Sequence, residues 1–505
     1  MRRTGPEQSK LPLMLAAEAD RMAPARVPED LWRRGRRRYQ RRLAGAVVAV
    51  LTVLAVALTL PGMLELAAEP PSTVAAPAGG AVPGRVFDPR VWQAPVTQSP
   101  GGSAAVLLSG SGKGLGGGDL PGMYGSKIAS VGRDGSYRML RYADTYLQVG
   151  QQVQLSPDGR FAVGPDAVED LIGSSQTQGR LSVVNLATGH TRHFKGLPAA
   201  VPVAWQPDSA ALLLWHKPGS PPIKYGETPP FDGNETKYGY VGGSLWLLDV
   251  ATGGSRKVLD IGTAAFDPIN SAAFAPDGRH LAVQLDRTLA LVNTADGSSL
   301  TLATLSAGQR LAGTGAFTAD GTRLALFDRD GCAVACTHAA RNQRQWRLVT
   351  LDAATGQPGP DGGFDRVPGA VVRLAGWQRN GTAVVVTYQN QQGPDYDREP
   401  SLELPTAYRT VSAANLLAVR PGGGTTQLIH PEGVQIWDID VAHDLVLDGR
   451  FGGPSPKPAV FPAAGWLYWL VLTPTAGLLL IVVLIVRWRR RARRWRPARD
   501  SGAGT

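Results

Sequence analysis

The residues of this 505-residue chain that could do chemistry are few and far apart. Its two cysteines, Cys332 and Cys336, lie four positions apart in DRDGCAVACTHAA, a glycine-bounded stretch that predicts a loop. In an oxidising compartment such a pair forms a small local disulfide. A metal site would need more ligands than the nearby His338 can add. We therefore expect a disulfide here, and neither a metal nor a cofactor.

Motifs for catalysis are missing or incomplete. The nucleophile elbow G-x-S-x-G does not occur, and none of the seven histidines has the H-E-x-x-H spacing of a zinc hydrolase. The segment GKGLGG (112–117) matches a phosphate-binding loop in letters only, because DLPGMYG follows it in place of a helix. DRDG (328–331) begins like a calcium loop but lacks the closing glutamate. These patterns predict no catalytic residue and a protein that is not an enzyme.

A repeated phrase predicts the elements that surround these residues. An apolar run ends, a tight turn of the Pro-Asp-Gly type follows, and an alternating apolar run resumes, which is the pattern of a β-hairpin. The five copies are QLSPDGRFAVG (154–164), AWQPDSAALLLW (204–215), AFAPDGRHLAVQ (273–284), AFTADGTRLALFD (316–328) and GWQRNGTAVVVTY (376–388).

A second phrase follows each copy and again predicts a strand, a turn and a strand. Its five copies are RLSVVNLATGHTRHF (180–194), SLWLLDVATGGSRKVL (244–259), TLALVNTADGSSLTLA (288–303), RLVTLDAATGQPG (347–359) and LLAVRPGGGTTQLI (416–429). Four short strands per repeat, at separations of about 44 to 68 residues, are typical of an all-β fold, the β-propeller. A helical solenoid is excluded because the apolar residues alternate with period two.

The ends of the repeat region predict how the ring closes. Residues 435–451 supply two more strands but no second phrase, and 103–141 supply a strand pair without a first phrase. We expect these pieces to combine in one blade. That arrangement gives six blades, with seven as the alternative, and it brings the two ends of the domain together.

Two long insertions interrupt the second and fifth repeats between their hairpins, at 217–243 and 389–410. Both are rich in Pro, Gly, Tyr and Asp. Long loops in a compact domain are either functional or idle, and both alternatives stay open here. The candidate binding residues are their aromatic side chains: Tyr225, Phe231, Tyr238, Tyr240, Tyr396 and Tyr408.

The repeated SPDGR or APDGR hairpin, followed by VNLATG or LDVATG, resembles the TolB-like and WD-repeat-like propellers. It is also similar to the propeller domains of prolyl-oligopeptidase-type enzymes. The resemblance covers roughly residues 100–450 and implies a fold, since propellers carry many unrelated sites. The Trp-Asp ending of strict WD repeats is absent, which favours the TolB-like side. The Ala-, Arg- and Gly-rich composition resembles that of actinobacterial proteins.

An apolar, uncharged run lies near each end of the chain, at 43–63 and 466–486, and each is long enough to cross a bilayer as a helix. Seven arginines precede the first run within 33–42, and eight follow the second within 487–499. We therefore expect both termini in the cytoplasm and the region between them outside. The alternative for the first run is a cleaved signal peptide, which is usually shorter and nearer the N-terminus.

The sequence thus divides into seven parts, and its charge follows this division. They are a basic cytoplasmic head (1–42), a transmembrane helix (43–63), a Pro/Ala/Gly-rich linker (64–100), an extracytoplasmic β-propeller (101–451), a linker (452–465), a second transmembrane helix (466–486) and a basic cytoplasmic tail (487–505). Of the net charge of +11, residues 1–43 and 487–505 carry +7 each, which leaves −3 for the rest. The nearly neutral outer domain argues against nucleic acid as a partner, and the basic ends suit the plasma membrane.

The expected function is a non-enzymatic binding or scaffolding module that is anchored in the plasma membrane and holds a protein or envelope ligand on the propeller face. A first alternative is a transmembrane sensor whose head engages a regulator such as a sigma factor. The head is similar to cytoplasmic segments of actinobacterial membrane proteins from sigma-factor operons, but without zinc-binding His and Cys residues. A second alternative is a propeller enzyme that acts on envelope carbohydrate.

Overall fold

The computed structural model describes most of the expected outer domain. The described residues are 80–89, 93–111, 128–140, 149–150, 153–166, 180–194, 200–216, 240–333, 336–393, 411–458, 477–478, 481 and 483–487. Within them, the chain forms six four-stranded antiparallel sheets that follow one another as the blades of a β-propeller. The predicted all-β propeller is confirmed, with six blades and not seven.

We number the blades from the one that closes the ring and give the strands of each from the centre outward. Blades 1 to 3 contain β29 (Gln435–Val441), β3 (Ala104–Ser111), β4 (Ile128–Gly132) and β5 (Tyr137–Leu140); β6 (Gln154–Leu155), β7 (Phe161–Asp166), β8 (Arg180–Asn185) and β9 (Thr191–Phe194); and β10 (Val201–Trp205), β11 (Ala211–His216), β13 (Ser244–Asp249) and β14 (Ser255–Asp260). Blades 4 to 6 contain β16 (Ala272–Phe274), β17 (His280–Leu285), β18 (Thr288–Asn293) and β19 (Ser299–Thr304); β20 (Gln309–Leu311), β21 (Arg323–Asp330), β22 (Gln345–Asp352) and β23 (Val367–Pro368); and β24 (Val371–Trp377), β25 (Ala383–Asn390), β26 (Val411–Val419) and β27 (Thr425–Gln427).

The repeated Pro-Asp-Gly phrase forms the turn between the first two strands of a blade. In blade 2, Gly159 has φ of 71°, a left-handed conformation that favours glycine, and its N–H donates to the carbonyl of Ser156 at 2.8 Å. A Cβ at Gly159 would also lie 2.1 Å from the carbonyl oxygen of Ala104 in the neighbouring blade. Glycine is therefore required both by the turn and by the packing between blades.

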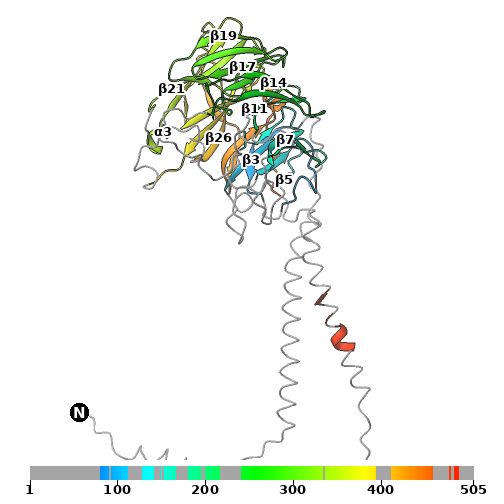
Figure 1. Cartoon of the computed structure of the whole chain (residues 1–505). Coiled ribbons are helices and arrows are strands. Elements are labelled where there is room, and N and C mark those ends of the chain that lie inside the picture. The colour runs from blue at the N-terminus through cyan, green and yellow to red at the C-terminus, as the bar shows by residue number, and fades with distance from the viewer. Residues whose placement is uncertain are drawn as a thin grey trace, which may run out of the picture. The chain divides into compact units, whose positions relative to one another are not determined.

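Blade 1 joins the two ends of the domain. β29 pairs with β3, and the register places Val441 opposite Val106 and Ile436 opposite Gly110. In Figure 1, orange strands from the end of the domain lie beside the blue strand β3 from its beginning. The predicted closure of the ring by a shared blade is confirmed.

The second strand expected within 435–451 is not formed where it was expected. The residues after β29 form the short helix α5 (His443–Leu447), which buries Leu445 and Val446. The chain then enters β30 (Phe451–Gly453), which pairs with β1 (Val82–Pro83) and not with blade 1. A helix allows two neighbouring apolar side chains to be buried together, whereas a strand would point them to opposite faces.

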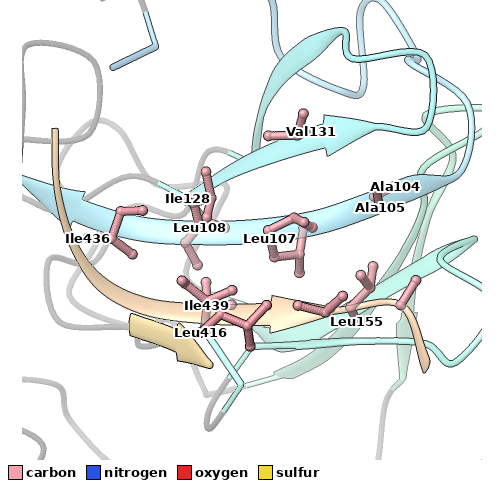
Figure 2. Packing of buried hydrophobic residues seen from close by; sticks show 14 of the residues in the cluster. Ala104, Ala105, Leu107, Leu108, Ile128, Val131, Leu155, Leu416, Ile436 and Ile439 are labelled. Carbon is pink, nitrogen blue, oxygen red and sulfur yellow. The ribbon is translucent and has the colours of Figure 1, made fainter. Parts of the chain in front are cut away.

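The core beneath blade 1 is apolar and extends into both neighbouring blades. Leu107, Leu108 and Ile439 are at most 1% exposed. Each such side chain stabilises the fold by about 1.5–3 kcal/mol relative to exposure. Figure 2 shows them packed with Ile436 of the same blade and with residues of the two adjacent sheets, Leu416 of β26 and Leu155 of β6.

The stretch 80–100 differs from the tether expected for 64–100. β1 pairs with β30, and β2 (Arg85–Phe87) pairs in parallel with β28 (His430–Glu432). Val82 and Val86 are fully buried, and Ala94 and Val96 bond to the backbone of Met139 in β5. The Pro- and Gly-rich composition suggested a linker, but valines spaced along it supply a face to bury. The folded part likewise continues past 451 through β30.

Connections in a four-stranded antiparallel blade alternate between its two ends, and this gives the propeller two distinct faces. The turns between first and second strands, and between third and fourth strands, lie on one face, which we call the turn face. The connections between second and third strands lie on the opposite face, which we call the loop face. Bonds between turns of adjacent blades, such as Asp158 N to Ser209 Oγ at 3.3 Å, show that the blades share this orientation.

The predicted transmembrane segments are almost wholly outside the described residues. Residues 43–63 are not described, and only Gly477, Leu478, Ile481 and 483–486 of the second run are, all of them helical. In the described part of the chain there is no helix whose length and apolar character would let it cross a membrane.

Candidate binding surface

The long connections between the second and third strands of a blade all begin and end at the loop face. These connections are 112–127 in blade 1, 167–179 in blade 2, 217–243 in blade 3, 331–344 in blade 5 and 391–410 in blade 6. Blade 4 has only the two-residue turn 286–287. The turn face, by contrast, carries mainly the short turns of the repeated phrases, although the connection 353–366 of blade 5 also belongs to it. The insertions singled out in the sequence therefore belong to a larger set of loops on one side of the ring.

The predicted binding residues lie mostly beyond what the structure describes. Tyr225, Phe231, Tyr238, Tyr396 and Tyr408 are outside the described residues.

Tyr240 lies in β12 (Tyr240–Val241), opposite Phe266 of β15 (Ala265–Phe266). This small pairing holds the end of the 217–243 insertion against the crossover between blades 3 and 4. Trp215 adds a second tie, because its indole N–H donates to the carbonyl of Gly242 at 3.0 Å. The insertion therefore leaves and rejoins the ring at fixed points.

A disulfide joins Cys332 and Cys336 in the loop of blade 5. The guanidinium of Arg344, which is fully buried, donates to the carbonyl of Cys332 at 2.8 Å and to that of Ala370 at 3.1 Å. It also lies 3.5 Å from the Cys336 sulfur. Arg344 therefore ties the disulfide loop to the start of blade 6.

The short helix α3 (His338–Asn342) follows this disulfide and rests on the base of the 391–410 connection. Asn342 and Asn390 bond reciprocally: Asn390 N donates to Asn342 Oδ1 at 2.7 Å, and Asn342 Nδ2 donates to the Asn390 carbonyl at 3.0 Å. His338 Nδ1 lies 3.0 Å from the carbonyl of Gln391. The disulfide loop of blade 5 therefore braces the point where the long connection of blade 6 begins.

At the centre of the ring, each of the six contacts between neighbouring blades contains a side chain that bonds to backbone of the next blade. The six bonds are Gln154 Nε2 to Pro202 O (3.1 Å), Gln206 Nε2 to Gly278 O (3.0 Å), Leu311 N to Gln284 Oε1 (2.7 Å), Arg310 Nη2 to Val372 O (2.8 Å), Arg373 Nη2 to Ile439 O (2.6 Å) and Leu155 N to Asp440 Oδ2 (2.7 Å). Such bonds hold the radial sheets in register, because backbone ladders stop at each blade.

The contact between blades 6 and 1 contains the most heavily charged part of this set. Arg373 of β24 donates through Nε to the Tyr388 hydroxyl at 3.2 Å, and this hydroxyl donates to Asp438 Oδ1 at 2.6 Å. Arg373 Nη2 lies 3.5 Å from the same carboxylate oxygen, and Nη1 lies 3.7 Å from Asp440. Arg373, Tyr388 and Asp438 are at most 1% exposed. This buried network, which we call the seam, holds the shared blade to its neighbour.

Burial governs the protonation of the seam. It raises the pKa of Asp438 to about 7, although the Arg373 charge and the Tyr388 hydroxyl act in the opposite direction. Burial also raises the pKa of Asp440, against the same Arg373 charge. Burial alone would lower the pKa of Arg373, but Tyr388, Asp438 and Asp440 together raise it. A carboxyl that is half protonated near neutral pH could act as an acid or base, but Asp438 is fully buried and bonded within the ring.

The sequence alone does not predict the seam. Its only trace is the placement of Arg373 in VVRLAGW and of two aspartates in QIWDIDV, where charges interrupt apolar strands. An exposed strand face gives the same pattern, so spacing alone does not distinguish the two cases.

As for metals, the described residues contain no group of three or more His, Cys, Asp or Glu side chains placed to hold an ion.

Comparisons with known proteins give similarity at the level of structure. No protein-family model and no curated protein sequence matches the chain. Among solved structures, TolB from Acinetobacter baumannii is 13% identical with a TM-score of 0.39, and the match covers 67% of this chain and 65% of that protein. The chain thus matches less than two thirds of that TolB.

Two further solved structures show similarity of the same kind. An oligogalacturonate lyase in complex with manganese is 14% identical with a TM-score of 0.38, over 68% of this chain and 77% of the lyase. A putative TolB from Agrobacterium tumefaciens is 12% identical with a TM-score of 0.29, over 46% and 71%. Identities and scores this low carry no argument about activity. The chain is a six-bladed β-propeller by its own strand pairing, and the solved structures similar to it include TolB proteins.

Proposed function

We propose that this protein is a membrane-anchored, non-enzymatic binding module whose ligand, a protein or another envelope component, is held on the loop face. The observation that carries the proposal is the division of the ring into two faces. Long connections of five blades begin and end at one face, and the ends of the folded domain lie at the other. Binding sites concentrate on loops that a rigid scaffold positions.

The position of the two ends of the folded domain follows from their contacts with the turn 133–136 of blade 1. This turn lies on the turn face. Gly80 packs against Arg133, where a Cβ would lie 2.5 Å from the Arg133 Cβ. Pro456 packs against Gly135, where a Cβ would lie 2.5 Å from the proline Cγ. The parallel pairing of β1 with β30 keeps the two ends side by side. An anchor at both ends would therefore leave the loop face open to a partner.

A binding role is further supported by the use that the fold makes of its buried charges. Arg373, Asp438 and Asp440 face one another and bond to the backbone of adjacent blades. Their contacts serve the closure of the ring. We therefore infer that these ionisable groups are structural and that recognition takes place on the loops.

Anchoring in the plasma membrane is supported by the two apolar runs and their arginine flanks. Among the described residues of the second run, apolar side chains are largely exposed, including Ile481 at 56% and Leu484 at 55%. A helix with apolar residues exposed in this way suits lipid. We propose two spans with both termini in the cytoplasm. Cysteines at Gly5 and Asp500 should then resist an impermeant thiol reagent in intact cells, whereas one at Thr188 should react.

Site-specific photo-cross-linking of the full-length protein in its native membrane tests the binding surface. A photoreactive residue at Tyr225 or Tyr396, in connections that begin and end at the loop face, should yield adducts with a partner. The matched control is the same residue at Ala295, which is exposed in the turn between β18 and β19 of blade 4, on the turn face. Adducts from Ala295 with none from Tyr225 or Tyr396 would contradict the proposal.

A further inference from the structure

A groove of about 480 Å³ lies between blades 2 and 3 on the turn face, away from the proposed binding surface. Its volume is within the range of small-molecule sites. Its apolar floor includes Val183 and Val250, which are 2% and 9% exposed, together with Phe161 and Ala210. Phe161 is fixed in place because its ring stacks on that of Trp205 at 6.3 Å. The groove therefore has a firm apolar base.

One residue of the groove departs from the repeat. The turn of blade 3 reads Pro-Asp-Ser where three other copies have glycine after the acidic residue, and Ser209 has φ of 62°. A left-handed conformation is unfavourable for serine, so the turn would be relieved by the glycine of the other copies. Ser209 Oγ accepts a hydrogen bond from Asp158 N at 3.3 Å, and within the described residues its O–H donates to no other group, so it can donate to a ligand in the groove.

The rim of the groove offers both donors and acceptors. The guanidinium of Arg160 lies over the Phe161 ring at 5.4 Å, with its Nε 4.0 Å from Asp158 Oδ2, and its side chain is 56% exposed. Within the described residues, Asn185 accepts two backbone N–H bonds through Oδ1, and its Nδ2 makes none. Asp208 likewise uses only Oδ1, for the N–H of Ala210. An amide donor, a carboxylate acceptor and a guanidinium therefore remain for a ligand.

The formal charges of the groove cancel. Arg160 and Arg192 are matched by Asp158 and Asp208. Arg192 is moreover committed to the fold, because it donates to the carbonyls of Val250, Ala251 and Thr252. An anion or a cation would gain little net attraction in such a site. A neutral ligand with many hydroxyl groups matches it better, since each hydroxyl both donates and accepts.

We propose that this groove binds a neutral sugar of one or two rings. The apolar C–H surface of the sugar would rest on the floor formed by Val183 and Val250, and its hydroxyls would bond to the rim. Arg160 and Ser209 are the residues most specific to this use, because one is an exposed donor and the other replaces the glycine that the turn favours. The site is independent of the loop face and of the function proposed for it.

Saturation-transfer NMR on the full-length protein tests the proposal, in a detergent without a sugar head group. The probes are glucose, galactose, mannose, arabinose, N-acetylglucosamine and maltose, with glucuronic acid and glucosamine as charged comparators. At least one neutral probe should bind more tightly than either charged one. A short-chain galactolipid below its micelle concentration is then compared with free galactose, because tighter binding of the lipid would identify a glycolipid head group as the source of the sugar.

Matched variants connect such binding to the groove. Arg160→Ala and Ser209→Gly should each weaken binding at least about fivefold. Ser209→Gly should change the melting temperature little, because glycine relieves the left-handed turn while the bond from Asp158 N is lost. The control is Arg279→Ala, the same position of the repeated turn in blade 4, which should change binding less than twofold. Absence of binding by every neutral probe, or binding that both groove variants leave intact, would overturn the proposal.

Discussion

The contacts between blades differ on the two sides of the ring. Between blades 2 and 3 the contact is a neutral amide, because Gln154 bonds to the carbonyls of Pro202 and Val203. Where blade 1 is assembled from the two ends of the domain, the contact is a buried arginine with a tyrosine and two aspartates. We infer that this directional ionic network fixes β29 against blade 6, in the position from which it pairs with β3 and closes the ring.

Removal of the closing strand should have the largest effect on the stability of the ring. A soluble form that ends after residue 433 lacks β29, so β3 loses its partner and the ring gains an open edge. It should unfold without cooperativity and aggregate, whereas a form that extends to residue 458 should melt in one sharp transition. Equal cooperativity in a calorimetric scan would show that the last strand does not close the ring.

Substitutions within the two contacts should have the next largest effect on the free energy of unfolding. Arg373→Leu leaves the fully buried Asp438 and the partly buried Asp440 without their cation and should lower the free energy of unfolding by about 3–5 kcal/mol. The matched change in the neutral contact, Gln154→Leu, removes one amide and should lower it by about 1–2 kcal/mol. Urea unfolding of both variants measures the difference. Equal losses would contradict a special role for the seam.

A change of pH should have a smaller effect on stability, and it should act on the seam but not on the neutral contact of Gln154. The folded state raises the pKa of Asp438 from 3.8 to about 7, so it binds this proton more tightly than the unfolded state does. The stability that this group contributes is complete at low pH and is lost as the pH rises from about 4 to about 7. The melting temperature of the wild type relative to Asp438→Asn should therefore fall over that interval. A difference independent of pH would contradict the raised pKa.

The disulfide brace should give the smallest effect on stability. In Cys332→Ser/Cys336→Ser, α3 loses its fixed position beneath Asn390, while the blades keep their pairing. Trypsin should then cleave faster after Arg398 and Arg409, in the 391–410 connection, with little change in melting temperature. Cleavage after Lys224 and Lys237, in the insertion of blade 3, is the internal control. Equal acceleration in both loops would show general loosening and not a local brace.

Some of this architecture could be predicted from the sequence because its causes are local. A turn such as Pro157-Asp158-Gly159 is determined by the conformational preferences of three residues, and two unmatched ends imply a shared blade. The seam could not be predicted, because the partners Arg373 and Asp438 are 65 residues apart and only the closed ring faces them toward each other. α5 was missed because five residues are too few for a helical period to be visible.

The binding loops are the least predictable part, since aromatic composition alone does not say whether a loop is idle. The position of the loops favours a functional role, because 217–239 and 394–410 belong to connections that begin and end at the same face. Strands β11, β13, β25 and β26, which flank them, pair along their whole length without the loops. Shortening a loop changes its closure entropy only slowly with length. Recognition can therefore be separated from folding by experiment.

The most direct measurement is capture of the cross-linked partner by a full-length protein in which 217–239 and 394–410 are both replaced by short Gly-Ser turns. The ring should melt within a few degrees of the wild type. Capture should fall at least about tenfold, equivalent to roughly 1.4 kcal/mol, because the loops supply the aromatic contacts. A variant that melts normally and captures the partner as well as the wild type would contradict the assignment of recognition to the loop face.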